Sequence, residues 1–226
     1  MLHTYAGLEM GVAATKTFTS QVVLMYLLAL RMAELRGTLA EAELEVLLGE
    51  LRSLPTKVLS CLESQTGIDE IAERHAEKPF FFFLGRHAGL PVCLEGALKL
   101  KEISYIPTEA YSAGEMKHGP IALIDERMPI VAIAPDDHVF EKMIGNMQEA
   151  KARGGAVIAI VSEVDSRLAG VLDPQNDVLI PMPRTTAMLT PIVMTIPLQL
   201  LAYHIAVRRG CDVDQPRNLA KSVTVE

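Results

Sequence analysis

The sequence predicts an α/β fold, a doubly wound and mostly parallel sheet, preceded by two long helices. From about Ile68 onward, short apolar runs alternate with segments of helical periodicity, which is the pattern of repeated βαβ units. The apolar runs show no alternation with polar residues. Uninterrupted runs of this kind are typical of parallel strands that helices cover on both faces.

Two helices are expected before this alternation begins. The first covers residues 15–36, where Thr15 is a plausible N-cap and Gly37 a good helix stop. The second covers about residues 40–62, where leucines and valines recur at helical spacing on either side of Pro55. We expect both helices to have packed on a domain that precedes the α/β unit.

Four strands and three helices follow in alternation. The expected strands are Phe80–Leu84, Pro129–Ala134, Ala156–Val161 and Val178–Ile180, and the expected helices are Leu90–Ser104, Phe140–Arg153 and Thr190–Arg209. No internal repeat or low-complexity tract interrupts them.

Composition narrows the class of protein. The net charge of −7 disfavours nucleic acid, which calls for a basic surface. The three cysteines lack C-x-x-C spacing, so neither a disulfide framework nor a cysteine zinc site is indicated. The longest apolar run, Val22–Leu30, is too short to span a bilayer, and the first residues lack the layout of a signal peptide. We therefore expect a reduced, intracellular globular protein.

A narrow charged stripe lies on the predicted helix Leu90–Ser104. Glu95, Lys99 and Glu102 are spaced by four and three residues, so they share one face. Apolar positions border the stripe, whereas a solvated face would be wider and more uniformly polar. Helical periodicity alone would favour an exposed ladder of salt bridges. The narrow stripe with its apolar borders instead favours ion pairs on the floor of a cleft.

Two further residues have acid–base or nucleophilic chemistry. His118 lies in a glycine-flanked loop, and imidazole titrates near neutral pH. Lys221 is the one lysine among small and apolar residues near the C-terminus, and a desolvated lysine amine attacks carbonyls. Taken singly, each residue is more often an ordinary surface residue.

Three stretches together resemble a known family. Leu94–Tyr105, Ala113–Pro120 and Asp212–Glu226 resemble, in order, segments of the isomerising glutamine–fructose-6-phosphate aminotransferases, the glucosamine-6-phosphate synthases. Members of that family carry a glutaminase domain followed by two sugar isomerase (SIS) domains. The resemblance runs from about Ala6 to the end of the chain.

The resemblance implies a mechanism and its residues. Lys221 would form a Schiff base with the C2 ketone of fructose 6-phosphate, and ammonia derived from glutamine would replace the lysine amine. Glu102 would move a proton between C1 and C2 to give glucosamine 6-phosphate, with Lys99 assisting. His118 would open the sugar ring from the neighbouring subunit of a homodimer. No metal or organic cofactor is required, and Glu95 is expected to be structural.

Two substrate contacts through the backbone, at Val12 and Ala220, also follow from the resemblance alone. Ala14 stands where the family commonly has serine, which puts a polar contact there in doubt. Asp136 and Asp137 follow the strand Pro129–Ala134 and would repel a phosphate. The second SIS domain is therefore expected to supply acid–base groups and not the phosphate grip.

The resemblance also implies a domain organisation. Residues 1–65 would be the C-terminal helical remnant of a first SIS domain, residues 66–215 a second SIS domain, and residues 216–226 a tail with the catalytic lysine. The glutaminase domain and the phosphate-binding loops would lie upstream. The isolated chain is then expected to be inactive. The protein is expected to lie in the cytoplasm and to bind neither nucleic acid nor membrane.

Two other functions stay open from the sequence. One is a non-catalytic SIS module that binds sugar phosphates. This alternative does not explain the presence of a terminal lysine together with Glu102 and His118. The other is a phosphosugar isomerase or deaminase that works without a glutaminase, for which phosphate-binding residues must lie within the chain.

Overall fold

A five-stranded parallel sheet forms the centre of the protein. The computed structural model describes residues 1–64, 67–162 and 165–221. The strands are β1 (Phe81–Gly85), β2 (Thr108–Ser112), β3 (Pro129–Ala134), β4 (Ala156–Val161) and β5 (Val178–Pro181), in the order β2-β1-β3-β4-β5. Every pairing is parallel. The doubly wound α/β class is confirmed. The expected boundary at residues 65 and 66, and the last five residues of the C-terminal motif, lie outside the described residues.

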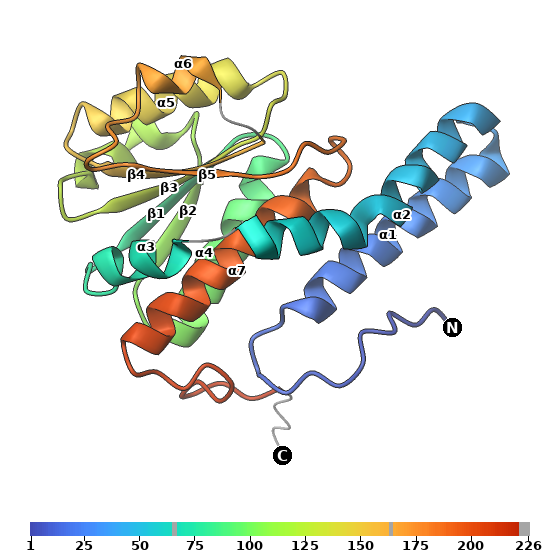
Figure 1. Cartoon of the computed structure of the whole chain (residues 1–226), viewed down its shortest axis with the longest axis horizontal. Helices are drawn as coiled ribbons and strands as arrows, with labels where there is room; N and C mark the ends of the chain where they lie inside the picture. The colour runs from blue at the N-terminus through green and yellow to red at the C-terminus, as the bar shows by residue number, and fades with distance from the viewer. Residues whose placement is uncertain (65–66, 163–164, 222–226) are drawn as a thin grey trace.

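Helices cover both faces of this sheet (Figure 1). On one face lie α3 (Ile68–His75), α4 (Gly89–Ser104) and α7 (Thr190–Arg208), and on the other lie α5 (Phe140–Lys151) and the short α6 (Ser166–Ala169). Successive strand residues point to opposite faces. Phe81 and Phe83 accordingly enter the core beneath α4 and α7, whereas Phe82 and Leu84 enter the core beneath α5. Because both faces are buried, the strands need no polar alternation.

The strand order reverses between β1 and β3. The chain passes from β1 through α4 to the edge strand β2, and then returns to β3 on the opposite side of β1. The loops after β1 and β3 therefore diverge at the carboxyl ends of two adjacent strands. Such a topological switch point is the usual ligand position in open α/β sheets.

Two glycines allow α4 to approach its neighbours. A Cβ on Gly85 would lie 2.5 Å from the backbone of Gly89, and one on Gly96 would lie 2.5 Å from a methyl group of Leu198. The first contact brings β1 close to the start of α4, and the second brings α4 close to α7. These approaches fix α4, which carries the charged stripe.

The two N-terminal helices form a hairpin that extends away from the sheet (Figure 1). They are α1 (Lys16–Arg36) and α2 (Glu41–Ser64), and α2 continues through Pro55. The inner end of the hairpin packs against the core through α2 and α7. By length and composition α1 and α7 could each cross a membrane, but α7 is largely buried as a core helix, whereas α1 is mostly exposed.

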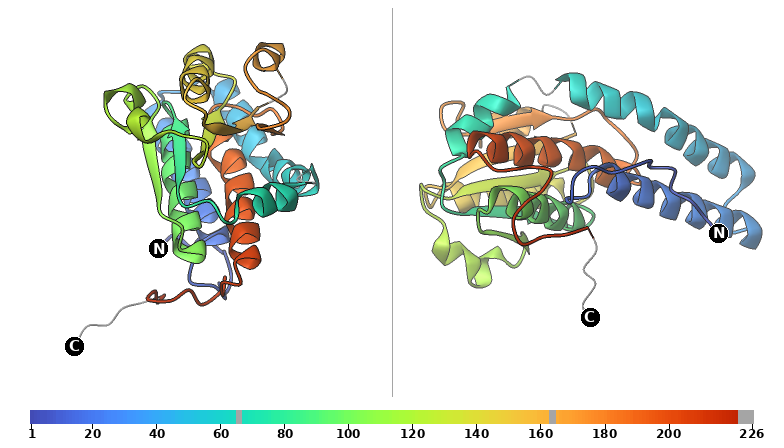
Figure 2. Two further views of the ribbon diagram at one scale, coloured as in Figure 1. Left: turned by 90° about the vertical axis from the view of Figure 1, so that its left-hand side faces the viewer. Right: turned by 90° about the horizontal axis from the view of Figure 1, so that it is seen from below.

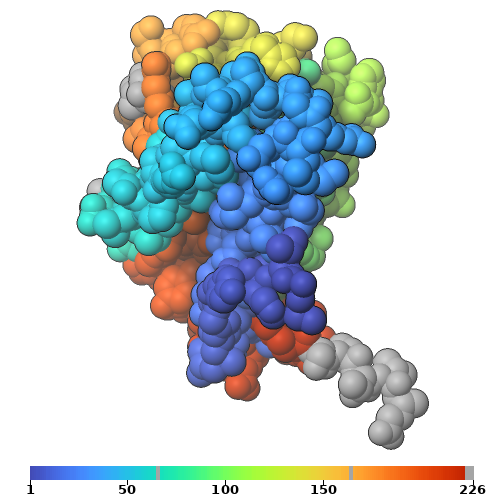
Figure 3. All heavy atoms as spheres, turned by 90° about the vertical axis from the view of Figure 1, so that its right-hand side faces the viewer, coloured from blue at the N-terminus to red at the C-terminus, as the bar shows by residue number. Residues whose placement is uncertain are grey.

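The two ends of the described chain lie side by side. Figure 3 shows the N-terminal segment next to the segment that follows α7. The amide of Val12 donates to the carbonyl of Asp214 at 2.9 Å. Figure 2 shows the same two segments beside each other, near the ends of α4 and α7. Residues separated by two hundred positions in sequence thus share one surface.

The structure adds several elements that the sequence pattern did not predict. They are β2, α3, α6 and two short 3-10 helices, η1 (Met116–His118) and η2 (Pro120–Leu123). β2 was missed because its sequence, Thr-Glu-Ala-Tyr-Ser, is half polar, as suits an edge strand with one open side. The others are too short to show a helical period.

Candidate active site

A cleft opens where the two chain ends cross α4 and α7. Its volume is about 320 Å³. Its walls come from the N-terminal segment, from α4 and α7, and from the segment after α7, and they include Glu9, Gly11, Lys99, Tyr203 and Asp214. A larger cavity of about 630 Å³ lies between α3, α6 and β5. None of the predicted site residues lines that larger cavity, so the chemistry of the predicted residues points to the smaller cleft.

Lys99 is the buried charge of this cleft. Only 4% of the residue is exposed, and its ammonium lies 2.6 Å from Glu102 Oε2 and 3.7 Å from Glu95 Oε1. Both ion pairs that the stripe predicts are present. They are sheltered at the wall of a cleft and do not form an exposed ladder. A buried ammonium needs such compensation, because desolvation of an unpaired charge is costly.

The two carboxylates of the stripe differ in their surroundings. The Glu95 side chain is the more buried of the two. Burial raises the pKa of Glu95, Lys99 opposes the shift, and the negative charge of Glu102 reinforces it. Glu102 lies closer to Lys99 and is more open to solvent. This arrangement suits Glu102 to exchange protons with a ligand, and Glu95 to hold Lys99.

The C-terminal segment is fastened to the end of α4. Tyr105, in a left-handed conformation with φ 62°, ends that helix. Its hydroxyl accepts a hydrogen bond from the amide of Arg217 at 2.8 Å, and the Arg217 guanidinium lies 4.2 Å from the centre of its ring. A cation over an aromatic ring adds to the attraction. The segment therefore reaches the cleft in a defined direction.

Lys221 reaches the N-terminal segment at the edge of the cleft. Its ammonium donates to Glu9 Oε2 at 2.6 Å and to the carbonyl of Gly11 at 2.9 Å. Glu9 and Gly11 both line the cleft that contains Lys99. The structure thus brings the predicted terminal lysine to the same cleft as the predicted charged stripe. The residues expected to cover Lys221, from 222 onward, lie outside the described part of the chain.

Glu9 is a site residue that the sequence analysis missed. Burial disfavours its charge, but hydrogen bonds from Lys221, the Thr17 hydroxyl and the Thr15 amide together lower the pKa of Glu9 to about 2. Its carboxylate also occupies the start of α1, where backbone donors are unpaired. No motif marks Glu9, since its importance comes from a contact across 212 positions.

The predicted backbone contacts lie close to this cleft. Val12 is flanked by Gly11 and Ala13, which both line it. Ala220 directly precedes Lys221 on the exposed surface of the tail. Neither residue is part of the lining itself, and a substrate contact through their backbone atoms stays a prediction.

His118 lies apart from this group. It is exposed in η1, on the connection between β2 and β3. It does not line the Lys99 cleft, and within the described part of the chain its side chain has no ion-pair or hydrogen-bond partner. Of the predicted catalytic residues, Lys99 lines this cleft. Glu102 is connected to it through its ion pair with Lys99, and Lys221 through Glu9 and Gly11, whereas His118 has no such contact among the described residues.

Comparison with known proteins defines the class. The SIS domain family matches residues 75–209 of the 226, so the chain belongs to the SIS domain family. This span contains the whole sheet and the charged stripe.

More specific similarity extends over the whole chain. It is 54% identical to a glutamine–fructose-6-phosphate aminotransferase [isomerizing] of Synechocystis and 52% identical to the Thermus thermophilus protein of that name. The chain spans about a third of the length of these relatives, 35% and 37%.

Solved structures agree with this assignment. The C-terminal domain of glucosamine-fructose-6-phosphate aminotransferase from Francisella tularensis superimposes with a TM-score of 0.87 at 43% identity, over 94% of this chain and 58% of that one. A glucosamine-6-phosphate deaminase from Thermotoga maritima shares the fold, with a TM-score of 0.64 at 23% identity, over 98% of this chain and 60% of that one.

Proposed function

We propose that the chain carries the sugar-isomerising part of a glucosamine-6-phosphate synthase. The reaction converts fructose 6-phosphate and ammonia derived from glutamine into glucosamine 6-phosphate. One observation carries the proposal beyond sequence similarity: the ammonium of Lys221 lies against two residues that line the Lys99 cleft. Lys99, which lines this cleft, is the ion-pair partner of Glu102, so the nucleophile and the base each contact residues of the same cleft.

In the proposed reaction, the Lys221 amine attacks the C2 ketone and water leaves, which gives a Schiff base. Ammonia then displaces the lysine amine and keeps the imine at C2. Glu102 takes a proton from C1 and returns it to C2, while the C1 hydroxyl loses its proton and the imine nitrogen gains one. The products are an aldehyde at C1 and an amine at C2. The imine acidifies the C1 proton, so an ordinary carboxylate suffices as the base. Lys99, 2.6 Å from Glu102, stabilises the charge of that carboxylate.

Lys221 has to leave its ion pair before it reacts. While Glu9 holds it, the Glu9 carboxylate stays ionised because its pKa is about 2, and the Lys221 ammonium donates to Glu9 and to the Gly11 carbonyl. A bound sugar that separates the two groups would free the Lys221 amine to reach the C2 ketone. Glu9 therefore holds Lys221 at the edge of the cleft in the absence of substrate.

The assembly and location belong to the same proposal. His118 lies outside the cleft of its own chain, so ring opening by this residue calls for a second copy and hence a homodimer. All three cysteines are free thiols, which suits the reducing cytoplasm.

Trapping the imine tests the proposed function. Because the isolated chain is expected to be inactive, the test uses the complete enzyme whose isomerising part we propose this chain to be. Incubation with fructose 6-phosphate and borohydride should leave a reduced sugar adduct on Lys221, located by peptide mass spectrometry. Lys221→Arg should leave none, because guanidinium keeps the charge but cannot act as the amine. Lys101→Arg, at an exposed position of α4, is the matched control and should react as the parent does. An adduct on Lys99 with Lys221 unmodified would contradict the proposal, as would no adduct on Lys221 at any sugar concentration.

A further inference from the structure

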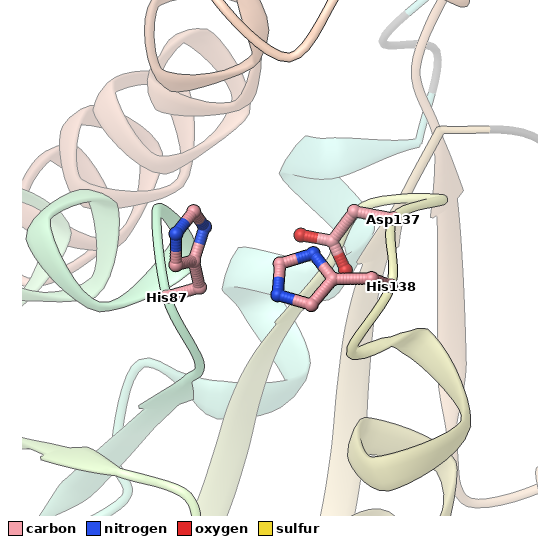
Figure 4. A group of neighbouring side chains, drawn as sticks. All are labelled: His87, Asp137 and His138. Atoms are coloured by element: carbon pink, nitrogen blue, oxygen red, sulfur yellow. The ribbon is translucent and has the colours of Figure 1, made fainter.

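A second group of reactive side chains lies at the topological switch point. His87 belongs to the loop after β1, and Asp137 and His138 belong to the loop after β3 (Figure 4). These loops leave adjacent strands where the sheet order reverses. None of the three residues lines the Lys99 cleft, and the proposed function uses none of them.

The three side chains converge. One ligand atom from each, a ring nitrogen from either histidine and an oxygen from Asp137, lie within 4.8 Å of one another. The two imidazole rings are 5.0 Å apart between centroids, at 78°, and Figure 4 shows the carboxylate beside them. Zinc ligands at about 2.1 Å from the ion are separated by roughly 3.4 Å in a tetrahedral site. Small side-chain rotations would close the remaining gap, because both histidines are exposed.

The surroundings leave these ligand atoms available. The Asp137 carboxylate accepts one hydrogen bond among the described residues, from the amide of Val139 to Oδ1 at 2.9 Å. That bond orients the carboxylate and leaves Oδ2 free, as outer-shell contacts do in metal sites. Arg86, the cation next to His87, is drawn away by a 2.9 Å bond to Asn146. Within the described ranges, no cationic side chain forms an ion pair with Asp137.

We propose that His87, Asp137 and His138 bind a divalent transition-metal ion, with Zn²⁺ as the probe. Two imidazole nitrogens and one carboxylate oxygen are ligands that zinc and its neighbours accept, whereas Mg²⁺ and Ca²⁺ prefer oxygen ligands throughout. Three protein ligands leave a fourth position for water or a ligand oxygen. The site contains no cysteine, so the cysteine spacing on which the sequence analysis relied could not reveal it.

Calorimetry with the EDTA-treated chain should show one Zn²⁺ per chain, and Co²⁺ should give the visible absorption of a nitrogen-and-oxygen site. His87→Gln and His138→Gln should each weaken binding by at least about tenfold. Asp137→Asn should weaken it too, although asparagine can keep the bond to Val139. Mg²⁺ in excess should not compete. His3→Gln, at an exposed histidine elsewhere, is the control and should bind as the parent does.

A measurement without substitutions guards against a variant that fails to fold. Paramagnetic Co²⁺ should broaden the imidazole proton signals of two of the six histidines. Absence of Zn²⁺ binding by the parent chain would overturn the site. So would unchanged affinity in both histidine variants, or equal loss in His3→Gln.

Discussion

At the scale of single residues, the chemistry of the cleft depends on how each charge is compensated. Lys99 is almost fully buried yet stays paired with two carboxylates. Glu95 and Glu102 come from the same helix face, but the first is more buried and its pKa is raised. Residues of one type, seven positions apart on one helix, thus differ in their burial. Glu102 remains close enough to solvent to meet a substrate.

This difference predicts how the two glutamates respond to neutralisation. Glu102→Gln is nearly isosteric, so the fold should survive. In the complete enzyme, isomerisation of the sugar should fall by about a hundredfold or more, since a general base is lost. Glu95→Gln should cost less activity and more stability, because it removes a buried partner of Lys99. Exchange of the C1 proton in deuterated water and thermal unfolding measure the two effects. Equal behaviour of both variants would mean that the stripe is only structural.

At the scale of elements, α3 shows how a short helix can make stability depend on pH. Its last residue, His75, is 2% exposed and packs edge-on against Phe81 of β1. Among the described residues neither ring nitrogen finds a hydrogen-bond partner. Burial, assisted by the positive charges of Lys78 and Arg74, lowers the pKa of His75 to about 4. The ring is therefore neutral in the folded protein at neutral pH.

Acid should destabilise the fold through this helix. Between about pH 6.5 and pH 4 the unfolded chain binds a proton at residue 75 that the folded chain does not, so stability falls as the pH falls. The loss attributable to His75 should be about 3 kcal/mol between pH 7 and pH 4. Urea unfolding across this range measures it. His75→Leu removes the titrating group, and its unfolding free energy should depend less on pH. Parallel curves for both proteins would refute this assignment.

At the scale of the whole molecule, the N-terminal hairpin leaves an apolar surface open. Only Leu30 of α1 is fully buried. Four large side chains at heptad-like spacing are exposed along α1: Met25, Leu28, Met32 and Leu35. Side chains with this spacing share one face of a helix, and contiguous apolar patches of this kind mark contact surfaces. The hairpin should therefore be covered by another molecule or domain.

The isolated chain should consequently form a dimer or a larger assembly. The double substitution Leu28→Glu with Met32→Glu should shift it toward monomer, because two charges cannot be buried in an apolar contact. Val207→Glu, at another exposed apolar residue on α7, should leave the assembly unchanged. Light scattering over a range of concentrations measures the mass. A clean monomer for the parent chain would contradict the expectation.

The sequence by itself determined the class of fold and most of its elements. Four apolar runs predicted β1, β3, β4 and β5, since strands buried on both faces need continuous apolar residues. The spacing of Glu95, Lys99 and Glu102 determined that they share a face, because helical geometry is local. β2 escaped prediction because an open edge strand tolerates polar residues. The division into residues 1–65, 66–215 and 216–226 stays a prediction.

Only the tertiary structure decided which distant residues meet. The contact of Lys221 with Glu9 joins the two ends of the chain, and the meeting of His87 with His138 depends on the order of strands in the sheet. Neither contact can be recognised from the periodicity of the sequence. Long-range pairs are set by packing and topology and not by the local conformation of either partner. The depth at which Lys99 lies was likewise decided by α7 and the chain ends that close over α4.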